Sequence, residues 1–371
     1  MIRMLKAINR FRIKIRDILK LIPRISSNVG EPSKMSYHPE RGIKSRIRIY
    51  LENLLWLLKY GELCENYYMY GFEQKDRKRD WADYIDYTSF KNLRNRHNRK
   101  KWIGGYFADY TCLLKDKFLF SRMLVSLGFP TPAVFALYSG GRFHWLNGSG
   151  GSDNTGIRSL EGKRVFCKSI LGECADGVFP LTIEDGRFYY HDNPITVPEI
   201  LDLTGGTFIL QEEIIQHPEM ARLFPHSVNT MRIVSFHFSG GTELFSGVLR
   251  AGTGQNTSDN WAIGGVLGLI NVETGELDKE FFYKPEYGTI CMRHPDTGVS
   301  LGNFQIPFFD EAMDMIRTLH PFFYGVKSIG WDIAVTENGP VFIEGNDNWE
   351  MNCYQKEEGG MRKTMEWFNR P

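Results

Sequence analysis

Residues 329–347 read IGWDIAVTENGPVFIEGND, in which two short apolar runs, IAV and VFI, flank the turn-like segment TENGP. Apolar runs on either side of a turn predict a β-hairpin that forms part of a core. Asp332 lies in the first run, and Glu344 and Asn346 end the second. Because an unpartnered carboxylate or amide is costly to bury, these three side chains indicate a polar site within the hairpin.

The spacing of the two acids depends on the length of the turn. If residues 337–339 form a three-residue loop with the glycine in the left-handed conformation, Thr336 lies opposite Pro340. Counting outward from that pair places Asp332 directly opposite Glu344, with Cβ atoms about 5 Å apart on one face. A two-residue turn would instead place the two acids on opposite faces.

Two interpretations of this acidic face remain open on spacing alone. Asn346 shares the face of Glu344 because side chains alternate along a strand with a period of two. Two close carboxylates repel each other, and the hairpin contains no Lys or Arg, so a cation between them is one interpretation. Oxygen ligands of this kind suit Mg²⁺, which takes one or two carboxylates together with phosphate oxygens and water. The other interpretation is that one acid is exposed and the other pairs with a distant arginine.

The composition limits the class of protein. The 371 residues are 42% hydrophobic and 14% aromatic, enough for two or three compact domains with a sizeable core. The six cysteines form no CxxC pair and no Cys/His cluster, which argues against structural zinc or disulfides and indicates a reducing cytosol. No apolar run approaches the roughly 18 residues of a membrane span, and the N-terminus lacks the apolar core of a secretion signal. We therefore expect a cytoplasmic protein.

Charge is distributed unevenly along the chain. Residues 1–101 carry 24 Lys and Arg and 11 Asp and Glu, a net charge of +13, whereas the remaining residues carry a net charge of −12. Nucleic acid, anionic lipid and an anionic substrate would each suit a positive surface. No RNA- or DNA-binding motif is recognisable, so we expect no nucleic-acid partner. The sequence does not indicate an oligomeric state.

Residues 1–24 place apolar side chains at spacings of three and four, opposite a face rich in Lys and Arg. This pattern predicts an amphipathic helix. The helix either packs on its own protein or lies on an anionic membrane surface, and the sequence leaves both open. A membrane contact would place the protein at the inner face of the membrane.

The pattern along the rest of the chain predicts an α+β fold with antiparallel sheets. Helices are expected at 43–70, 116–127, 196–204 and 308–320, and the charge runs at 73–84 and 91–102 are typical of solvated helix faces. Many short strands separated by Gly-rich turns follow residue 130. We expect a basic, mainly helical region at 1–104, one lobe at 105–215 and a second lobe at 216–371.

Lys168 ends an apolar strand and is followed by a loop bounded by Gly172 and Gly177. Backbone amides of such a loop can approach phosphate groups, and a lysine supplies a point charge. The same pattern is also common in ordinary hairpins. No Walker A motif and no protein-kinase motif set occurs in the sequence.

Two further strand segments carry polar residues. Gln211, Glu212 and Glu213 end an apolar strand, where they either hydrogen-bond an adenine and a ribose or are simply solvated. Arg232 and Arg250 interrupt apolar strands, and a buried arginine needs an anion, which is either an internal acid or a ligand. Asp259 and Asn260 lie in a polar loop before a pair of glycines.

Taken together and in this order, these segments resemble the ATP-grasp superfamily, and most closely its sugar-transfer-associated subgroup. The resemblance spans roughly residues 105–350. It is carried by Asp116-Lys117 with GFPTP, by Lys168 and its glycine loop, and by LQEEIIQHPEM, HSVNTMRIVSF, DNWAIGGV, TGEL and GWDIAVTENGPVFIEGN. The loop departs from the usual form of the superfamily, because it has Glu173-Cys174-Ala175-Asp176 between its glycines.

The resemblance implies two α+β lobes that clasp ATP and a set of residues that bind it. Lys168 would contact the α- and β-phosphates, with Lys117 assisting. Gln211 to Ile214 would form the adenine-binding hinge, with Glu212 or Glu213 facing the ribose or the adenine amine. Asp332, Glu344 and Asn346 would hold Mg²⁺, or alternatively Mn²⁺. Arg232, Arg250 and Asn260 match the positions that steady the γ-phosphate and an acylphosphate in the amino-acid-ligating branch.

The implied reaction is the joining of a carboxylate to an amine. ATP phosphorylates the carboxylate to an acylphosphate, the amine attacks, and phosphate leaves, while the protein supplies alignment and charge neutralisation. The subgroup implies a sugar or glycan precursor as substrate, modified with an amino acid or amine, as in polysaccharide biosynthesis. The alternatives are a kinase that phosphorylates a hydroxyl and a non-catalytic protein that has kept the fold.

Overall fold

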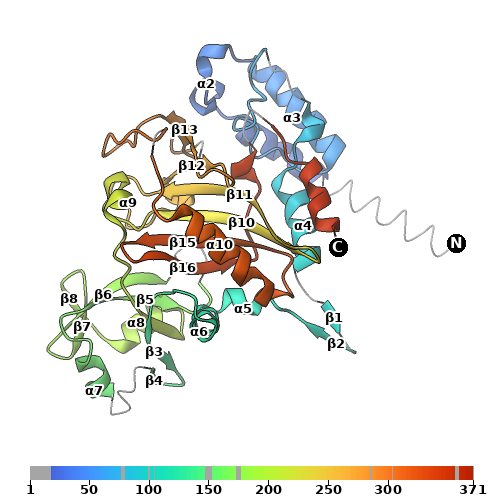
Figure 1. Ribbon diagram of the computed structural model, residues 1–371. Coiled ribbons are helices and arrows are strands. Elements are labelled where there is room, and N and C mark those ends of the chain that lie inside the picture. The colour runs from blue at the N-terminus through green and yellow to red at the C-terminus, as the bar shows by residue number, and fades with distance from the viewer. Residues whose placement is uncertain are drawn as a thin grey trace. The chain divides into compact units, whose positions relative to one another are not determined.

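The computed structural model describes residues 18–76, 80–98, 101–103, 105–146, 153–172, 177–284, 286–302, 304–355 and 359–370. The chain forms two compact units (Figure 1). The helical unit consists of residues 1–97, 282–291 and 350–371, and the sheet unit consists of residues 98–281 and 292–349. Most of the amphipathic helix expected at 1–24 lies outside the described residues.

The helical unit is built around a cluster of aromatic side chains. Residues 18–29 are helical. The other elements are α2 (Pro32–Met35), η1 (Pro39–Arg41), α3 (Arg46–Tyr60), η2 (Trp81–Asp83), α4 (Tyr87–Asn98), β14 (Ile290–Cys291), η5 (Asn352–Tyr354) and η6 (Lys363–Asn369). Phe72 lies 5.9 Å from Trp56 and 4.9 Å from Tyr84, and Tyr84 lies 4.8 Å from Tyr70, between ring centroids. This tightly packed cluster is the core of the unit.

The C-terminal segment of the chain completes the helical unit. The buried Gln355 side chain accepts a hydrogen bond from the Ile85 amide at 3.0 Å and donates to the Ile85 carbonyl at 2.7 Å. The Arg362 amide donates to the Asp83 carbonyl at 2.8 Å. Residues 350–371, and also residues 282–291, group with this unit, whereas the sequence places them in the expected second lobe. Contacts between residues so distant along the chain leave no local sequence signal.

The sheet unit contains two large sheets, as expected for an α+β fold, and their described pairings are antiparallel. The first has the order β4-β3-β9-β5-β6-β7-β8, and the second, within this unit, has the order β13-β12-β11-β10-β15-β16. The strands of the first are β3 (Val134–Ser139), β4 (Arg142–Trp145), β5 (Arg164–Ser169), β6 (Val178–Glu184), β7 (Arg187–Tyr190), β8 (Asn193–Ile195) and β9 (Phe208–Glu212). The strands of the second are β10 (Thr230–Phe238), β11 (Gly241–Ala251), β12 (Val266–Ile270), β13 (Leu277–Phe282), β15 (Ser328–Thr336) and β16 (Gly339–Asn346). A separate short hairpin pairs β1 (Lys101–Ile103) with β2 (Tyr106–Ala108).

The helices of the sheet unit follow their sequence signals closely. They are α5 (Cys112–Lys115), α6 (Lys117–Leu127), α7 (Asp153–Arg158), α8 (Val197–Thr204), α9 (Pro218–Leu223) and α10 (Phe309–Leu319), with the short helices η3 (Trp261–Ile263) and η4 (His320–Phe323). Asp116 caps α6 by accepting hydrogen bonds from two amides at 2.9 Å, and Gly128 ends it with a φ of +80°. Helix α10 lies across the second sheet (Figure 1) and packs its apolar face on β11 and β16. The helices expected at 116–127, 196–204 and 308–320 are confirmed.

Two helices expected in the helical unit are shorter or absent. Helix α3 ends at Gly61, which has a φ of +79°, and residues 61–73 form turns, so the expectation of a helix at 43–70 was too long. The described part of 73–84 contains turns and the three residues of η2 in place of a solvated helix. Here the aromatic cluster determines the conformation of the backbone, and tertiary packing overrides local preference.

The β15–β16 hairpin has a different turn from the one expected, but its two acids pair as expected. Thr336 pairs with Gly339, not with Pro340, so the loop is one residue shorter than predicted. The register then shifts between Asp332 and Ile333, which leaves one extra residue in β16. This β-bulge compensates for the shorter loop, and Asp332 faces Glu344 as predicted.

Backbone hydrogen bonds join the two sheets near this hairpin. The His217 amide, which follows β9, donates to the Val335 carbonyl of β15 at 2.7 Å. The Phe342 amide of β16 donates to the Pro130 carbonyl, which precedes β3, at 3.0 Å. The β15–β16 hairpin is therefore hydrogen-bonded to the segment before β3 and to the segment after β9, two strands that pair with each other in the first sheet.

Gly268 tests the packing of the second sheet. A Cβ atom at this position in β12 would lie 1.9 Å from the ring of Phe281, which is fully buried. We expect Gly268→Ala to lower the free energy of unfolding by about 1–3 kcal/mol, the usual cost of overpacking a core. Denaturant unfolding measures the change. Gly240→Ala is the matched control, because its Cβ meets no atom within 4 Å, and an equal loss in both variants would contradict the packing.

Candidate functional site

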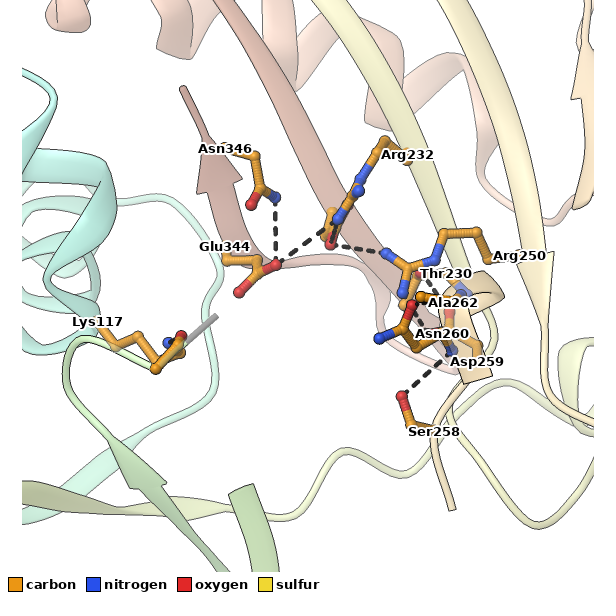
Figure 2. A network of polar contacts seen from close by, with 12 residues as sticks. Lys117, Thr230, Arg232, Arg250, Ser258, Asp259, Asn260, Ala262, Glu344 and Asn346 are labelled. Carbon is orange, nitrogen blue, oxygen red and sulfur yellow. Dashed lines mark hydrogen bonds and ion pairs between the residues drawn. The ribbon is translucent and has the colours of Figure 1, made fainter. Parts of the chain in front are cut away.

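Two arginines converge on one buried carboxylate in the second sheet (Figure 2). Arg232 on β10 donates from Nε to Asp332 Oδ1 at 2.6 Å and from Nη2 to Asp332 Oδ2 at 2.5 Å. Arg250 on β11 donates from Nη1 to Asp332 Oδ2 at 3.0 Å. Because β11, β10 and β15 are adjacent and Arg232 is the direct cross-strand partner of Asp332, the sheet register itself brings the three side chains together.

The network continues from Arg250 into the loop that precedes β12. Arg250 Nη2 donates to Asp259 Oδ1 at 2.9 Å. The other oxygen of Asp259 accepts from the amide of Thr230 at 3.0 Å and from its hydroxyl at 2.5 Å. Asn260 follows directly, and its side-chain oxygen accepts from the Ala262 amide at 3.0 Å (Figure 2). The loop is thus anchored to the sheet through a buried acid.

At the other end of the network lies Glu344 on β16. Its Oε1 lies 3.8 Å from Arg232 Nη2 and accepts a hydrogen bond from Asn346 Nδ2 at 3.2 Å. Glu344 and Asn346 are half-buried, whereas Asp332 is buried. The three side chains that the sequence analysis selected therefore lie together on one face, as Figure 2 shows for the two that it labels.

The two facing acids have opposite pKa shifts. Burial alone would raise the pKa of Asp332, but Arg232 and Arg250 outweigh it and lower that pKa to about 2. Burial, followed by repulsion from the Asp332 charge, raises the pKa of Glu344 above its usual value. Asp332 therefore carries its negative charge more readily than Glu344, whose ionisation its surroundings disfavour.

Two lysines from the first sheet and its preceding helix act on the same acid. Burial, together with the charge of Lys117, lowers the pKa of Lys168 to about 8, and the carboxylate of Glu344 opposes this shift. Lys117 at the start of α6 donates from Nζ to the carbonyl of Gly172, and in Figure 2 it approaches Glu344 from the side opposite the arginines. Positive side chains thus lie on both sides of the acidic hairpin.

The glycine loop is partly described. Gly177 has a φ of +64°, and a Cβ there would lie 2.9 Å from the Cβ of Ser169, so the end of the loop requires glycine. Residues 173–176, whose amides were considered for phosphate binding, lie outside the described residues. The carbonyl of Gly172, which binds Lys117, links the start of the loop to α6.

The expected hinge residues make several contacts within the protein. Gln211 is buried and donates from Nε2 to the Pro132 carbonyl at 3.1 Å. Glu212 is exposed, and its Oε2 accepts from the Ala133 amide at 3.2 Å. Glu213 Oε1 accepts from Arg164 Nη1 at 2.6 Å, and Ile214 is half-buried. The side chains of Gln211 and Glu213 therefore hold the strand ends in place.

The donor set of the hairpin suits Mg²⁺. No group of three or more His, Cys, Asp or Glu side chains arranged for a metal occurs among the described residues, so the candidates are two carboxylates and one amide. Mg²⁺ binds through one or two carboxylates when phosphate oxygens and water complete its shell. Burial, and after it repulsion from Asp332, raises the pKa of Glu344, so the protein by itself disfavours a negative charge there. A cation at Glu344 and Asn346, beside Asp332, would relieve that repulsion.

Sequence reasoning missed the role of Asp259 and Thr230. The signal was present, because an arginine within an apolar strand needs an anion. Arg250 finds two internal anions, Asp259 and Asp332, and the second interpretation of the acidic face, pairing with a distant arginine, is confirmed for Asp332. What the sequence did not indicate is that one aspartate serves both arginines.

Comparison with solved structures finds distant similarities. The ATP-grasp ligase PsnB complexed with its minimal precursor has 10% identity and a TM-score of 0.38, with 70% of this chain and 60% of that chain covered. N5-carboxyaminoimidazole ribonucleotide synthetase from Thermotoga maritima has 11% identity and a TM-score of 0.38, with coverage of 70% and 50%. D-alanyl-alanine synthetase A from Vibrio cholerae has 10% identity and a TM-score of 0.37, with coverage of 69% and 61%. The chain spans about half to three-fifths of the length of these structures.

The family assignment rests on a match to a known protein family. No match was found among curated proteins. The match to the family described as sugar-transfer associated ATP-grasp covers residues 99–368, which is more than half of the chain and includes all the candidate site residues. The chain belongs to the sugar-transfer associated ATP-grasp family.

Proposed function

We propose that this protein is an ATP- and Mg²⁺-dependent carboxylate–amine ligase that works through an acylphosphate. The observation that carries the proposal is the asymmetric acid pair, in which Asp332 orients Arg232 and Arg250 while Glu344 keeps a raised pKa. That arrangement offers two fixed positive groups and one group ready for a cation on a single face. It suits a reaction whose main demand is neutralisation of phosphate charge.

The proposed roles follow from what holds each side chain. Lys168 and Lys117 place positive charge beside the glycine loop, where they would bind the phosphates of ATP. Arg232 and Arg250 are held by ion pairs, so their guanidinium groups would face an acylphosphate without further ordering. Asn260 adds an amide beside them. Glu212 is the exposed hinge acid, and it would face the ribose or the adenine amine.

Glu344, Asn346 and Asp332 would hold Mg²⁺, whose chemical contribution when bound is neutralisation of charge on phosphate oxygens. The carboxylate substrate gains a phosphoryl group from ATP, which leaves as ADP. The amine then attacks the acyl carbon and loses a proton, and inorganic phosphate departs. No covalent bond to the protein forms in this sequence.

The substrate is proposed from the family, and the cellular location from the sequence. A sugar or glycan precursor is the proposed substrate, joined to an amino acid or amine, because the family is associated with sugar transfer. No helix among the described residues is long and apolar enough to cross a membrane. We propose a cytoplasmic protein that contacts the inner face of the membrane, partly through residues 1–24, whose basic amphipathic pattern suits an anionic surface.

A product screen tests the reaction class. The purified protein with Mg²⁺ and ATP is incubated with pairs of uronic-acid sugars and amino acids, and phosphate release and product masses are measured. We expect phosphate release that requires both partners, with a product heavier by the amine and lighter by water. A stable phosphorylated product formed without an amine would identify a kinase and reject the ligase proposal.

Glu344→Gln tests the metal assignment. Because glutamine keeps the shape but lacks the charge, we expect Mg²⁺-dependent nucleotide affinity to fall by about 10- to 100-fold or more, the range seen when metal sites are disturbed. Calorimetric titration of ATP with and without Mg²⁺ measures the change. Glu219→Gln serves as the matched control, since its partner is the exposed Arg222 and it lies outside the proposed site. Equal Mg²⁺ dependence in Glu344→Gln and the native protein would remove Glu344 from the site.

The same variant tests the raised pKa of Glu344. A carboxyl whose pKa is raised in the folded protein contributes stability below its unfolded-state pKa, and that contribution is lost as pH rises through the folded-state pKa. Glutamine stays neutral, so Glu344→Gln should gain melting temperature relative to the native protein as pH rises from the usual pKa of a glutamate, 4.5, through the raised folded-state pKa. If the melting-temperature difference between the two proteins did not change with pH, the pKa of Glu344 would not be raised in the folded protein.

Lys168 should make ATP binding sensitive to alkaline pH. Its pKa is lowered to about 8, so the free protein loses this positive charge as pH rises through that value, well below the range of an ordinary lysine. We expect the affinity for ATP to fall by about 10-fold for each pH unit above that pKa, and Lys168→Arg to flatten this fall because arginine stays charged. Fluorescence titration with ATP across pH measures both. If the ATP affinity of Lys168→Arg fell equally at alkaline pH, the fall would be due to another titrating group.

A further inference from the structure

Helix α3 of the helical unit has a second apolar face that the described part of the chain leaves exposed. Its inner face buries Ile49, Asn53, Trp56 and Leu57. On the outer side, the exposed fractions are 75% for Ile47, 51% for Leu51, 56% for Leu55 and 59% for Leu58. These four residues are separated by four, four and three positions, so they lie in one stripe along the helix. We refer to them as the outer stripe.

A continuous row of four large apolar side chains differs from scattered surface leucines. Single exposed apolar residues are normal and need no explanation, whereas a contiguous apolar surface marks an interaction site. The stripe runs along almost the whole of α3, which spans Arg46–Tyr60. Helix α3 thus has two apolar faces: one packs in the core of its unit, and the other is exposed.

The surroundings of the outer stripe are basic. Arg46, Arg48 and Lys59 on α3 are exposed. The one acid of the helix, Glu52, is half-buried and accepts from Lys44 Nζ at 2.9 Å and from Arg48 Nε at 3.1 Å, so its charge is compensated. The helix therefore presents apolar side chains beside a net positive charge. Residues 1–101 as a whole carry a net charge of +13.

We propose that the outer stripe of α3 docks on an anionic phospholipid surface. Leucine and isoleucine side chains would enter the boundary between headgroups and acyl chains, while the flanking arginines and lysine pair with lipid phosphates. Long basic side chains suit this position, because their stems cover apolar surface while their charged ends reach the headgroups. This inference rests on the helical unit and is independent of the proposed ligase reaction.

Charge distinguishes this partner from two others. Residues 1–17 also carry an apolar stripe, but they hold six Lys and Arg against one Asp, so packing them on α3 would bring like charges together. A second copy of α3 packed against the first would also face Arg48 and Lys59 with the same basic side chains. An anionic bilayer complements the apolar stripe and the flanking charge at once.

A vesicle-binding experiment with the full chain tests the proposal. The protein is sedimented with vesicles of mixed phosphatidylcholine and phosphatidylglycerol, or of phosphatidylcholine alone. We expect Leu51→Gln/Leu55→Gln/Leu58→Gln to lower the partition coefficient on the anionic vesicles by about 10-fold or more, because each burial of a leucine is worth at least that factor when complete. Binding should also fall as salt is raised from about 0.1 M to 1 M, which screens the charges.

A matched variant and a deletion distinguish the possible outcomes. Leu119→Gln/Val125→Gln/Leu203→Gln changes three apolar side chains of similar exposure on α6 and α8, and it should bind vesicles as the native chain does. Glutamine preserves helix propensity, and circular dichroism checks that each variant is folded. Equal vesicle binding by the outer-stripe variant and the native chain would overturn the proposal. It would also be overturned if deleting residues 1–17, with the outer stripe intact, abolished vesicle binding. Light scattering measures the oligomeric state. If the native chain forms a dimer but does not bind vesicles, and the outer-stripe variant is a monomer, the stripe binds a second copy and the proposal is overturned.

Discussion

The ion pairs of Asp332 with Arg232 and Arg250 are the contact on which the candidate site depends. One carboxylate from β15 binds guanidinium groups from the two neighbouring strands, and both of its oxygens are used. Removing charge from water is costly, and breaking one partner of a buried pair typically costs about 3–5 kcal/mol because a charge is left uncompensated. The arginines are therefore held in one orientation, and the strand register, which makes Arg232 and Asp332 direct partners, sets that orientation. Asp259 extends the same constraint into the loop that carries Asn260.

This arrangement has a consequence for the facing acid. Burial raises the pKa of Glu344, and repulsion from Asp332, which the two arginines hold in its charged form, raises it further. Two chemically similar side chains on one hairpin therefore have different tasks, as their environments push their pKa values apart. A protein that used these residues for stability alone would gain by pairing or replacing Glu344. Keeping a half-buried acid in this state is consistent with a site that takes a cation together with an anionic ligand.

Much of the fold could be predicted from the sequence where the signals are local. Asp116 and Gly128 bound α6 as a cap and a left-handed stop, and apolar periodicity located α8 and α10. The prediction of α3 ran too far because Gly61, a left-handed stop, was not read as one and because aromatic packing holds residues 61–73 in turns. Residues 350–371, expected in the second lobe, group with the helical unit, and hydrogen bonds such as those of Gln355 to Ile85 join residues far apart in the chain.

The sequence by itself determined which side chains could form the site: Asp332 opposite Glu344, Asn346 beside it, and arginines within apolar strands that had to find anions. It did so because strand periodicity and the cost of burying charge are properties of the residues themselves. Tertiary structure decided the pairing. The turn is shorter than predicted, and a β-bulge restores the facing acids, so the predicted pair is correct although the register that led to it was not. Which acid binds the arginines, and which has its pKa raised, depends on the order of β11, β10, β15 and β16 in the sheet, and strand order is set by contacts that no single segment contains.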